Sequence, residues 1–138
     1  MERDRIPLAR KASLIARNEA GILAVYKPAG IKTHPNREGE IAALMAPYNA
    51  QKEYFKTAQG ATYHLCNRLD APTAGILIFA EEEQAARAVK SAFQKQRVEK
   101  VYLAAVKGVP AHSSGSWEDA LLIKKQGGKI RTHRQGTA

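Results

Sequence analysis

The strongest constraint in this sequence is an unbroken apolar run at residues 76–80, Ile-Leu-Ile-Phe-Ala, which is followed at once by a helical pattern. Five consecutive apolar residues, with Gly75 before them and Glu81 after them, predict a strand that is buried on both faces. Three acidic residues at 81–83 then stand where the dipole of a helix favours negative charge. Apolar side chains follow at helical spacing: Ala85, Val89, Ala92 and Phe93. A strand that leads directly into an amphipathic helix therefore forms the centre of the expected fold.

A second apolar stretch, residues 22–26, predicts another strand. Pro28 has no N–H for a sheet and Gly30 frees the backbone, so the strand is expected to end in a tight turn. Residues 1–20 show no clear period and are interpreted as a tail.

The remaining segments are assigned from their apolar patterns and from the Pro and Gly residues that interrupt them. Residues 41–44 predict a short helix that Pro47 stops, and residues 48–63 predict a loop with some helix. Residues 101–106 predict a further strand. Within a basic C-terminal segment, 111–138, residues 121–123 and 129–130 predict a hairpin. The mixture indicates an α+β fold with a mostly antiparallel sheet and flanking helices.

Composition limits the class of protein. A chain of 138 residues that is 44% hydrophobic holds one domain, expected over residues 1–138. Its apolar runs are shorter than the roughly 20 residues that span a bilayer, and its first residues are too charged for a signal peptide. A single cysteine, Cys66, forms no internal disulfide and gives no zinc motif. We therefore expect a cytoplasmic protein with no metal site and no membrane partner.

Positive charge is concentrated at the C-terminal end. Residues 84–138 carry 11 Lys and Arg against 3 Asp and Glu, which accounts for +8 of the net +9. An excess of this kind attracts polyanions, and nucleic acid is the commonest polyanionic partner of a small intracellular domain. RNA or DNA binding is therefore one of the functions that the charge favours.

A short polar run, Asn-Arg-Leu-Asp at residues 67–70, precedes the central strand. Arg68 and Asp70 stand two residues apart, so an extended backbone would direct both side chains to the same side. From the residues alone, Asp70 is either a functional carboxylate or a turn residue that bonds the backbone near Thr73 or pairs with Arg68.

Three segments together resemble the RluA family of RNA pseudouridine synthases, which convert uridine in RNA into its C-linked isomer. The segments are Val25-Tyr26-Lys27-Pro28-Ala29-Gly30, then Arg68-Leu69-Asp70 with Thr73 and Gly75, and Lys100-Val101-Tyr102. Their order and spacing match the family over about residues 20–110. The resemblance implies a pseudouridine synthase-like fold, an RNA partner (rRNA or tRNA), and neither cofactor nor metal.

The resemblance assigns the catalytic role to Asp70. A carboxylate can attack the sugar carbon as a nucleophile or abstract a ribose proton, and both routes stay open. It also implies substrate contacts for Arg68, which would follow the RNA backbone or fill the stack left by a flipped-out uridine. Tyr102 would stack on the uracil, although a plain core tyrosine is the alternative.

Basic residues near these segments are candidate RNA contacts that position the phosphate backbone. For each, an ordinary solvated charge is the alternative. They are Lys27, Lys100, Lys124, Lys125 and Arg131.

Two departures from the family pattern matter. Asn67 stands where the family usually has His, a change that keeps a polar neighbour for Arg68. The later strand motifs of the family have no counterpart, so the second half of the fold is expected to be missing, and the fragment Arg131-Thr132-His133-Arg134 does not replace it. A relative that binds RNA without catalysing a reaction is therefore the alternative function.

Overall fold

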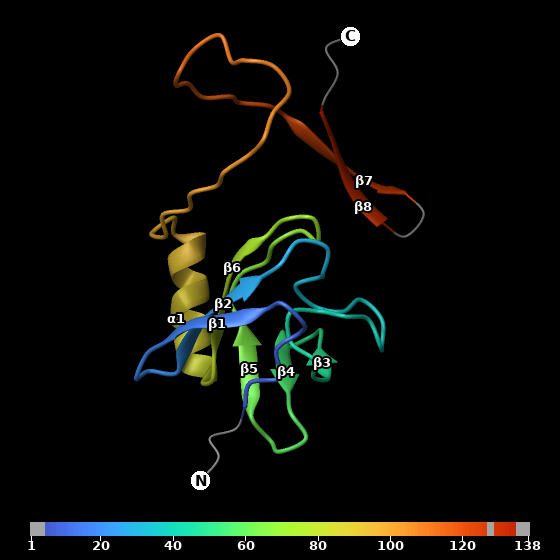
Figure 1. Ribbon diagram of the computed structural model, residues 1–138, viewed down its shortest axis with the longest axis vertical. Coiled ribbons are helices and arrows are strands. Elements are labelled where there is room, and N and C mark those ends of the chain that lie inside the picture. Colours follow the sequence, from blue (N-terminus) through green and yellow to red (C-terminus); the bar gives the residue numbers. More distant parts are fainter. Residues whose placement is uncertain (1–4, 127–128, 135–138) are drawn as a thin grey trace. The chain divides into compact units, whose positions relative to one another are not determined.

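The computed structural model describes residues 5–126 and 129–134, with side chains described as far as residue 122. The chain divides into two compact units, Met1–Lys100 and Val101–Ala138 (Figure 1). The first unit contains a six-stranded sheet in the order β1-β2-β6-β5-β4-β3, and all neighbouring strands are antiparallel. The expectation of an α+β fold built on a mostly antiparallel sheet is confirmed.

The elements of the first unit are short. Its strands are β1 (Ser13–Arg17), β2 (Ile22–Lys27), β3 (Tyr48–Asn49), β4 (Tyr54–Lys56), β5 (Thr62–Leu65) and β6 (Gly75–Ala80). The helix α1 (Glu83–Gln94) follows β6 and packs on β5 and β6. The second unit contains the predicted hairpin, formed by β7 (Leu121–Gln126) and β8 (Lys129–Arg134).

The predicted strands at 22–26 and 76–80 pair with each other as β2 and β6, in a register that runs from Ile22–Ala80 to Lys27–Gly75. Alternate side chains of both strands enter the main core, which also receives residues from β4 and β5. The prediction that β6 is buried on both faces is wrong at one end of the strand, because Ile76 is 45% exposed. The second face of β6 is covered only where α1 crosses it.

The predicted helix is confirmed as α1. Ala86 is buried against Ala80 and Cys66, and Ala85 and Val89 pack at the edge of the same cluster. On its exposed side, Arg87 donates to Glu83 one turn earlier at 2.6 Å.

Two predictions for the N-terminal half are wrong. The segment expected as a tail contains β1, which pairs with β2. The segment 41–44 is irregular instead of helical, because its backbone bonds are made with other segments. The Ala43 N–H donates to the Lys32 carbonyl at 2.9 Å, and the Ala43 carbonyl accepts from the Ala9 N–H at 3.1 Å. Ala42, Ala43 and Leu44 are buried in the main core as a result.

Two further segments differ from expectation. Residues 48–63, predicted as loop with some helix, supply β3, β4 and the start of β5. Residues 101–106, predicted as a strand, have no regular structure and are exposed. A strand needs a partner for its backbone groups, and the described residues supply one to the first segment and none to the second.

Within the described residues, no helix is long and apolar enough to cross a membrane. Over the same residues, no cluster of His, Cys, Asp and Glu has the arrangement needed to hold a metal ion.

Candidate active site

The polar run singled out in the sequence lies in the irregular segment between β5 and β6. Asp70 is exposed in this segment, and its carbonyl accepts a hydrogen bond from the Thr73 N–H at 2.9 Å, which closes a turn. The residues before and after Asp70 are both held by one distant segment, residues 27–33, which begins at the last residue of β2.

Thr33 holds the residue before Asp70. Its hydroxyl donates to the Leu69 carbonyl at 2.7 Å and accepts from the Leu69 N–H at 3.0 Å. Thr33 is only 5% exposed, so water does not reach its hydroxyl and the Leu69 backbone supplies its hydrogen-bond partners. Glu40 supports the same segment by accepting from Lys32 at 2.7 Å, and that contact is the main reason why its pKa falls to about 2.

Lys27 and Gly30 hold the residue after Asp70. The Gly30 N–H donates to the Ala71 carbonyl at 2.7 Å, from a backbone with φ of +92° that a side chain would strain. The Lys27 ammonium donates to the same carbonyl at 3.1 Å, and to the carbonyls of Pro28 and Ile31 at 2.9 and 2.8 Å. All three N–H donors of the lysine are therefore bonded to backbone.

The assignment of Lys27 as an RNA contact is wrong. The side chain is completely buried at 0% exposure, because it follows Leu23 and Val25 on the core-facing side of β2. Burial lowers the pKa of its ammonium, and the negative charge of Asp70 opposes that decrease. Lys27 holds the backbone next to Asp70, close enough for the two charges to interact.

Asn67 fixes the beginning of the segment. Its side-chain oxygen accepts from the Ile78 N–H at 2.7 Å, and its side-chain nitrogen donates to the Ile76 carbonyl at 3.2 Å. The amide thus occupies the place that another residue of β5 would take beside β6. Asn67, which stands where the family usually has His, therefore presents both a donor and an acceptor to β6.

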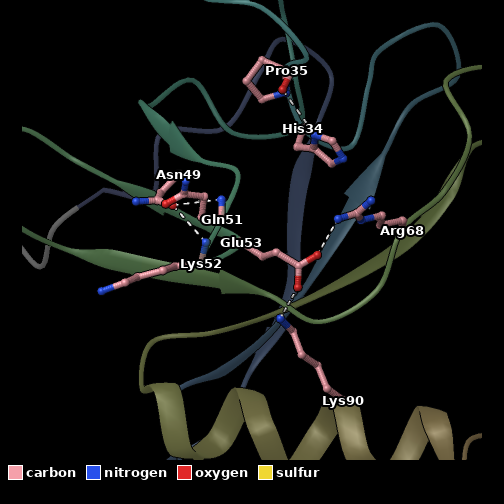
Figure 2. A network of polar contacts seen from close by, with 8 residues as sticks. All are labelled: His34, Pro35, Asn49, Gln51, Lys52, Glu53, Arg68 and Lys90. Atoms are coloured by element: carbon pink, nitrogen blue, oxygen red, sulfur yellow. Dashed lines mark hydrogen bonds and ion pairs between the residues drawn. The ribbon is translucent and has the colours of Figure 1, made fainter. Parts of the chain in front are cut away.

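Arg68 forms an ion pair with Glu53, which also accepts from the Lys90 ammonium at 2.6 Å (Figure 2). Among the described residues, Arg68 makes no ion pair with Asp70, so the pairing considered from the sequence is not formed. The bond from Lys90 is the main cause that lowers the pKa of Glu53; burial opposes it, and Arg68 adds to it. Arg68 is 55% exposed in this pair and remains accessible to a ligand.

A cavity of about 180 Å³ opens between this cluster and α1. It is lined by Glu53, Leu65, Cys66, Asn67, Arg68, Lys90, Phe93 and Gln94. The cavity combines two cations, one carboxylate and one aromatic ring beside the segment that carries Asp70.

The structure does not include the other predicted contacts among the residues that line this cavity. Lys100 is exposed at the end of the first unit. Tyr102 belongs to the second unit, where it is 63% exposed and outside any strand. The backbones of Lys124, Lys125 and Arg131 lie in β7 and β8, and their side chains lie outside the described part of the structure.

Residues 21–137 match the family model for RNA pseudouridylate synthase, which includes the segments that hold Asp70. The chain belongs to this family. The sequence-based resemblance to RluA-type enzymes is thereby confirmed.

Several curated relatives carry names from the same family. The chain is 31% identical to the mitochondrial pseudouridylate synthase RPUSD4 of Xenopus tropicalis, over 88% of this chain and 37% of the relative. It is 32% identical to ribosomal large subunit pseudouridine synthase C of Rickettsia bellii, over 91% of this chain and 40% of the relative. The chain thus spans less than half the length of these family members. No solved structure is significantly similar to it.

Several residues that build this candidate site were not found from the sequence. Glu53 lies in the segment to which no chemistry was assigned, and Lys90 is one of several polar residues on α1. Thr33 carried a weak signal, because it follows the Lys-Pro-Ala-Gly turn closely. Tertiary contacts bring these residues to the Asp70 segment: β2 pairs with β6, β4 pairs with β5, and α1 packs on β5 and β6.

We expect replacement of Thr33 with Val to loosen the Asp70 segment. Valine keeps the shape but removes the hydroxyl, so both backbone groups of Leu69 lose their partner, at a cost of about 1–3 kcal/mol in unfolding free energy. Thr33→Ser keeps the hydroxyl and is the matched control. Chemical denaturation of both variants checks this, and equal stability of the two would contradict it.

We also expect the Cys66 thiol to react slowly. Burial raises its pKa to about 11, and the residue is 7% exposed, so little thiolate forms or is reached at pH 8. Alkylation by iodoacetamide should be at least about tenfold slower in the folded chain than in denaturant. Equal rates in both conditions would contradict the burial of this side chain.

Proposed function

We propose that this chain is an RNA pseudouridine synthase that isomerises uridine to pseudouridine in rRNA or tRNA, with Asp70 as the catalytic carboxylate. The observation that carries the proposal is the placement of Asp70: its side chain is exposed, while both backbone neighbours are held by buried groups of residues 27–33. A reacting group that is held in this way loses little freedom when substrate binds.

The reaction requires a carboxylate. The N-glycosidic bond of uridine breaks, the detached uracil turns while it is held, and a carbon–carbon bond to the ribose forms. Positive charge develops on the ribose, which an ionised Asp70 stabilises either as a nucleophile on the sugar carbon or as the base that removes a ribose proton. The buried ammonium of Lys27 lies close enough to Asp70 for the negative charge of Asp70 to affect the pKa of the lysine.

The proposal for the substrate follows the chemistry of the accessible groups. Arg68 is the exposed cation nearest to Asp70 in sequence and would contact the RNA backbone or the vacated stack. Tyr102 is proposed to stack on the uracil. Exposed Lys100, and the basic side chains of Lys124, Lys125 and Arg131, are proposed to contact phosphates. Named relatives include a ribosomal large subunit enzyme and a tRNA enzyme, which makes rRNA and tRNA the classes to test.

The test is incubation of the 138-residue chain with unmodified rRNA and tRNA transcripts, followed by position-resolved mapping of pseudouridine. New pseudouridines that an identically purified Asp70→Asn preparation does not form would support the proposal. RNA binding without any Asp70-dependent pseudouridine would instead identify the chain as an RNA-binding relative that does not catalyse the reaction.

A further inference from the structure

The loop that carries Glu53 is built to present one carboxylate. The Asn49 side chain accepts hydrogen bonds from the N–H groups of Gln51 and Lys52, at 3.1 and 2.9 Å, and shapes the connection between β3 and β4 (Figure 2). Glu53 has a φ of +54°, a left-handed conformation that costs a residue with a side chain roughly 1 kcal/mol. Its carbonyl is fixed by the Leu65 N–H at 2.8 Å. A strained but well-held residue of this kind calls for a functional explanation.

The carboxylate of Glu53 lies between two cations from different elements. One oxygen pairs with Arg68 in the Asp70 segment, and the other accepts from Lys90 on α1 at 2.6 Å. A carboxylate and a phosphodiester each present two anionic oxygens on one central atom, so cations that are spaced for one are also spaced for the other. Two cations and one anion leave the cluster with a positive charge.

The cluster is open to a ligand. Arg68 is 55% exposed, and Glu53 and Lys90 are 34% and 31% exposed. All three side chains line the cavity of about 180 Å³, beside Phe93 and Gln94. A phosphate that enters this cavity meets both cations without any rearrangement of the core.

We infer that Arg68 and Lys90 form a phosphate-binding site for RNA, and that Glu53 occupies this site as an internal competitor until RNA displaces its carboxylate. The inference rests on the proposed function, because the phosphate is that of the RNA substrate. It adds Lys90 and Glu53 to the residues that govern substrate binding. It also assigns Arg68 to the RNA backbone in the initial complex, with the phosphate placed next to the segment that carries Asp70.

The test compares two ion pairs, each of which has its cation on α1. Glu53–Lys90 borders the cavity, whereas Glu83–Arg87 is an exposed pair on the same helix whose members do not line it. Binding of a short unmodified RNA stem-loop is measured by fluorescence anisotropy over a series of salt concentrations. The variants are Lys90→Met, Lys90→Arg and Glu53→Gln, with Arg87→Met and Glu83→Gln as matched controls, and cooperative denaturation establishes that each is folded.

Lys90→Met is expected to weaken binding about 3- to 10-fold at low salt and to reduce the slope of log K against log salt by about 0.7–0.9, the value for one lost phosphate contact. Lys90→Arg should retain most of the affinity and most of the salt dependence of the unchanged chain. Glu53→Gln should strengthen binding about 2- to 5-fold, because the competing carboxylate is gone. The two control variants should change affinity less than about 2-fold.

If Lys90→Met and Arg87→Met weakened RNA binding equally, the inference would be overturned, since RNA would then be attracted only by the general positive charge of the surface. Weaker binding by Glu53→Gln would also overturn it, and would make the cluster a structural support for the Asp70 segment. Pseudouridine formation by the unchanged chain is measured in parallel. If that activity is present while the binding pattern is absent, only the phosphate site is wrong; if the chain neither binds nor modifies RNA, the proposed function fails as well.

Discussion

Replacing Asp70 with Asn is expected to abolish pseudouridine formation while leaving RNA affinity within about twofold of the unchanged chain. Asparagine has nearly the same shape but can neither attack the ribose carbon nor accept its proton, so the rate should fall on the order of 10³-fold or more. Asp70 is exposed, and its backbone contacts do not depend on the side-chain charge. Single-turnover mapping of pseudouridine, together with anisotropy of the same RNA, checks both parts.

The matched control for Asp70→Asn is Glu38→Gln, which removes one exposed carboxylate from the same unit outside the Asp70 segment. It should retain the activity. A second readout is the pKa of the Lys27 ammonium, which should fall further in Asp70→Asn because the charge that opposes burial is removed. Nitrogen-detected NMR of the lysine side chain follows this change, and unchanged activity in Asp70→Asn would refute the catalytic role.

Replacing Lys27 with Met is expected to produce the largest loss of stability. The change removes three charge-assisted hydrogen bonds to the carbonyls of Pro28, Ile31 and Ala71 in a completely buried site. Lost bonds of this kind should lower the free energy of unfolding by about 2–4 kcal/mol, although an apolar side chain avoids the cost of burying a charge. For a unit of this size the melting temperature should fall by roughly 10–20 °C.

Lys32→Met is the control for that experiment. Lys32 lies five residues later and makes one partly exposed ion pair with Glu40, so its loss should cost less than about 1 kcal/mol. Thermal and urea denaturation of both variants gives the comparison. Similar losses for the two lysines would show that the buried ammonium does not hold the Asp70 segment as we describe.

The strands β2 and β6 and the helix α1 were predictable because each carries a continuous local pattern of apolar residues. The short strands β3 and β4 were not, because strands of two and three residues have no periodicity of their own. They exist through the pairing of β3 with β4 and of β4 with β5. At residues 101–106 a strand was predicted that the structure does not contain. Their β-branched and apolar composition favoured a strand, but the described residues provide no neighbouring strand to bond them.

For the candidate site, the sequence identified Asp70 and Arg68 through the family motif, and the assignment of their roles stays a prediction. Lys27 was misassigned although a signal was present: Leu23, Val25 and Lys27 alternate along β2, which places the lysine on the buried face. Glu53 left no such signal, since its ion pairs depend on how the β3–β4 connection approaches α1. Local patterns do not encode that approach.

The bonds that hold the Asp70 segment join residues far apart in the chain, with separations of 44 positions for Lys27 and Ala71 and 36 for Thr33 and Leu69. Such contacts form late in folding, because the loop between them must first be closed by pairing of β2 with β6. A nascent or partly unfolded chain therefore carries the same aspartate without the geometry to use it. The amide protons of Gly30 and Leu69 should exchange with solvent only when β2 and β6 separate, so opening of the central sheet and dismantling of the site are one event.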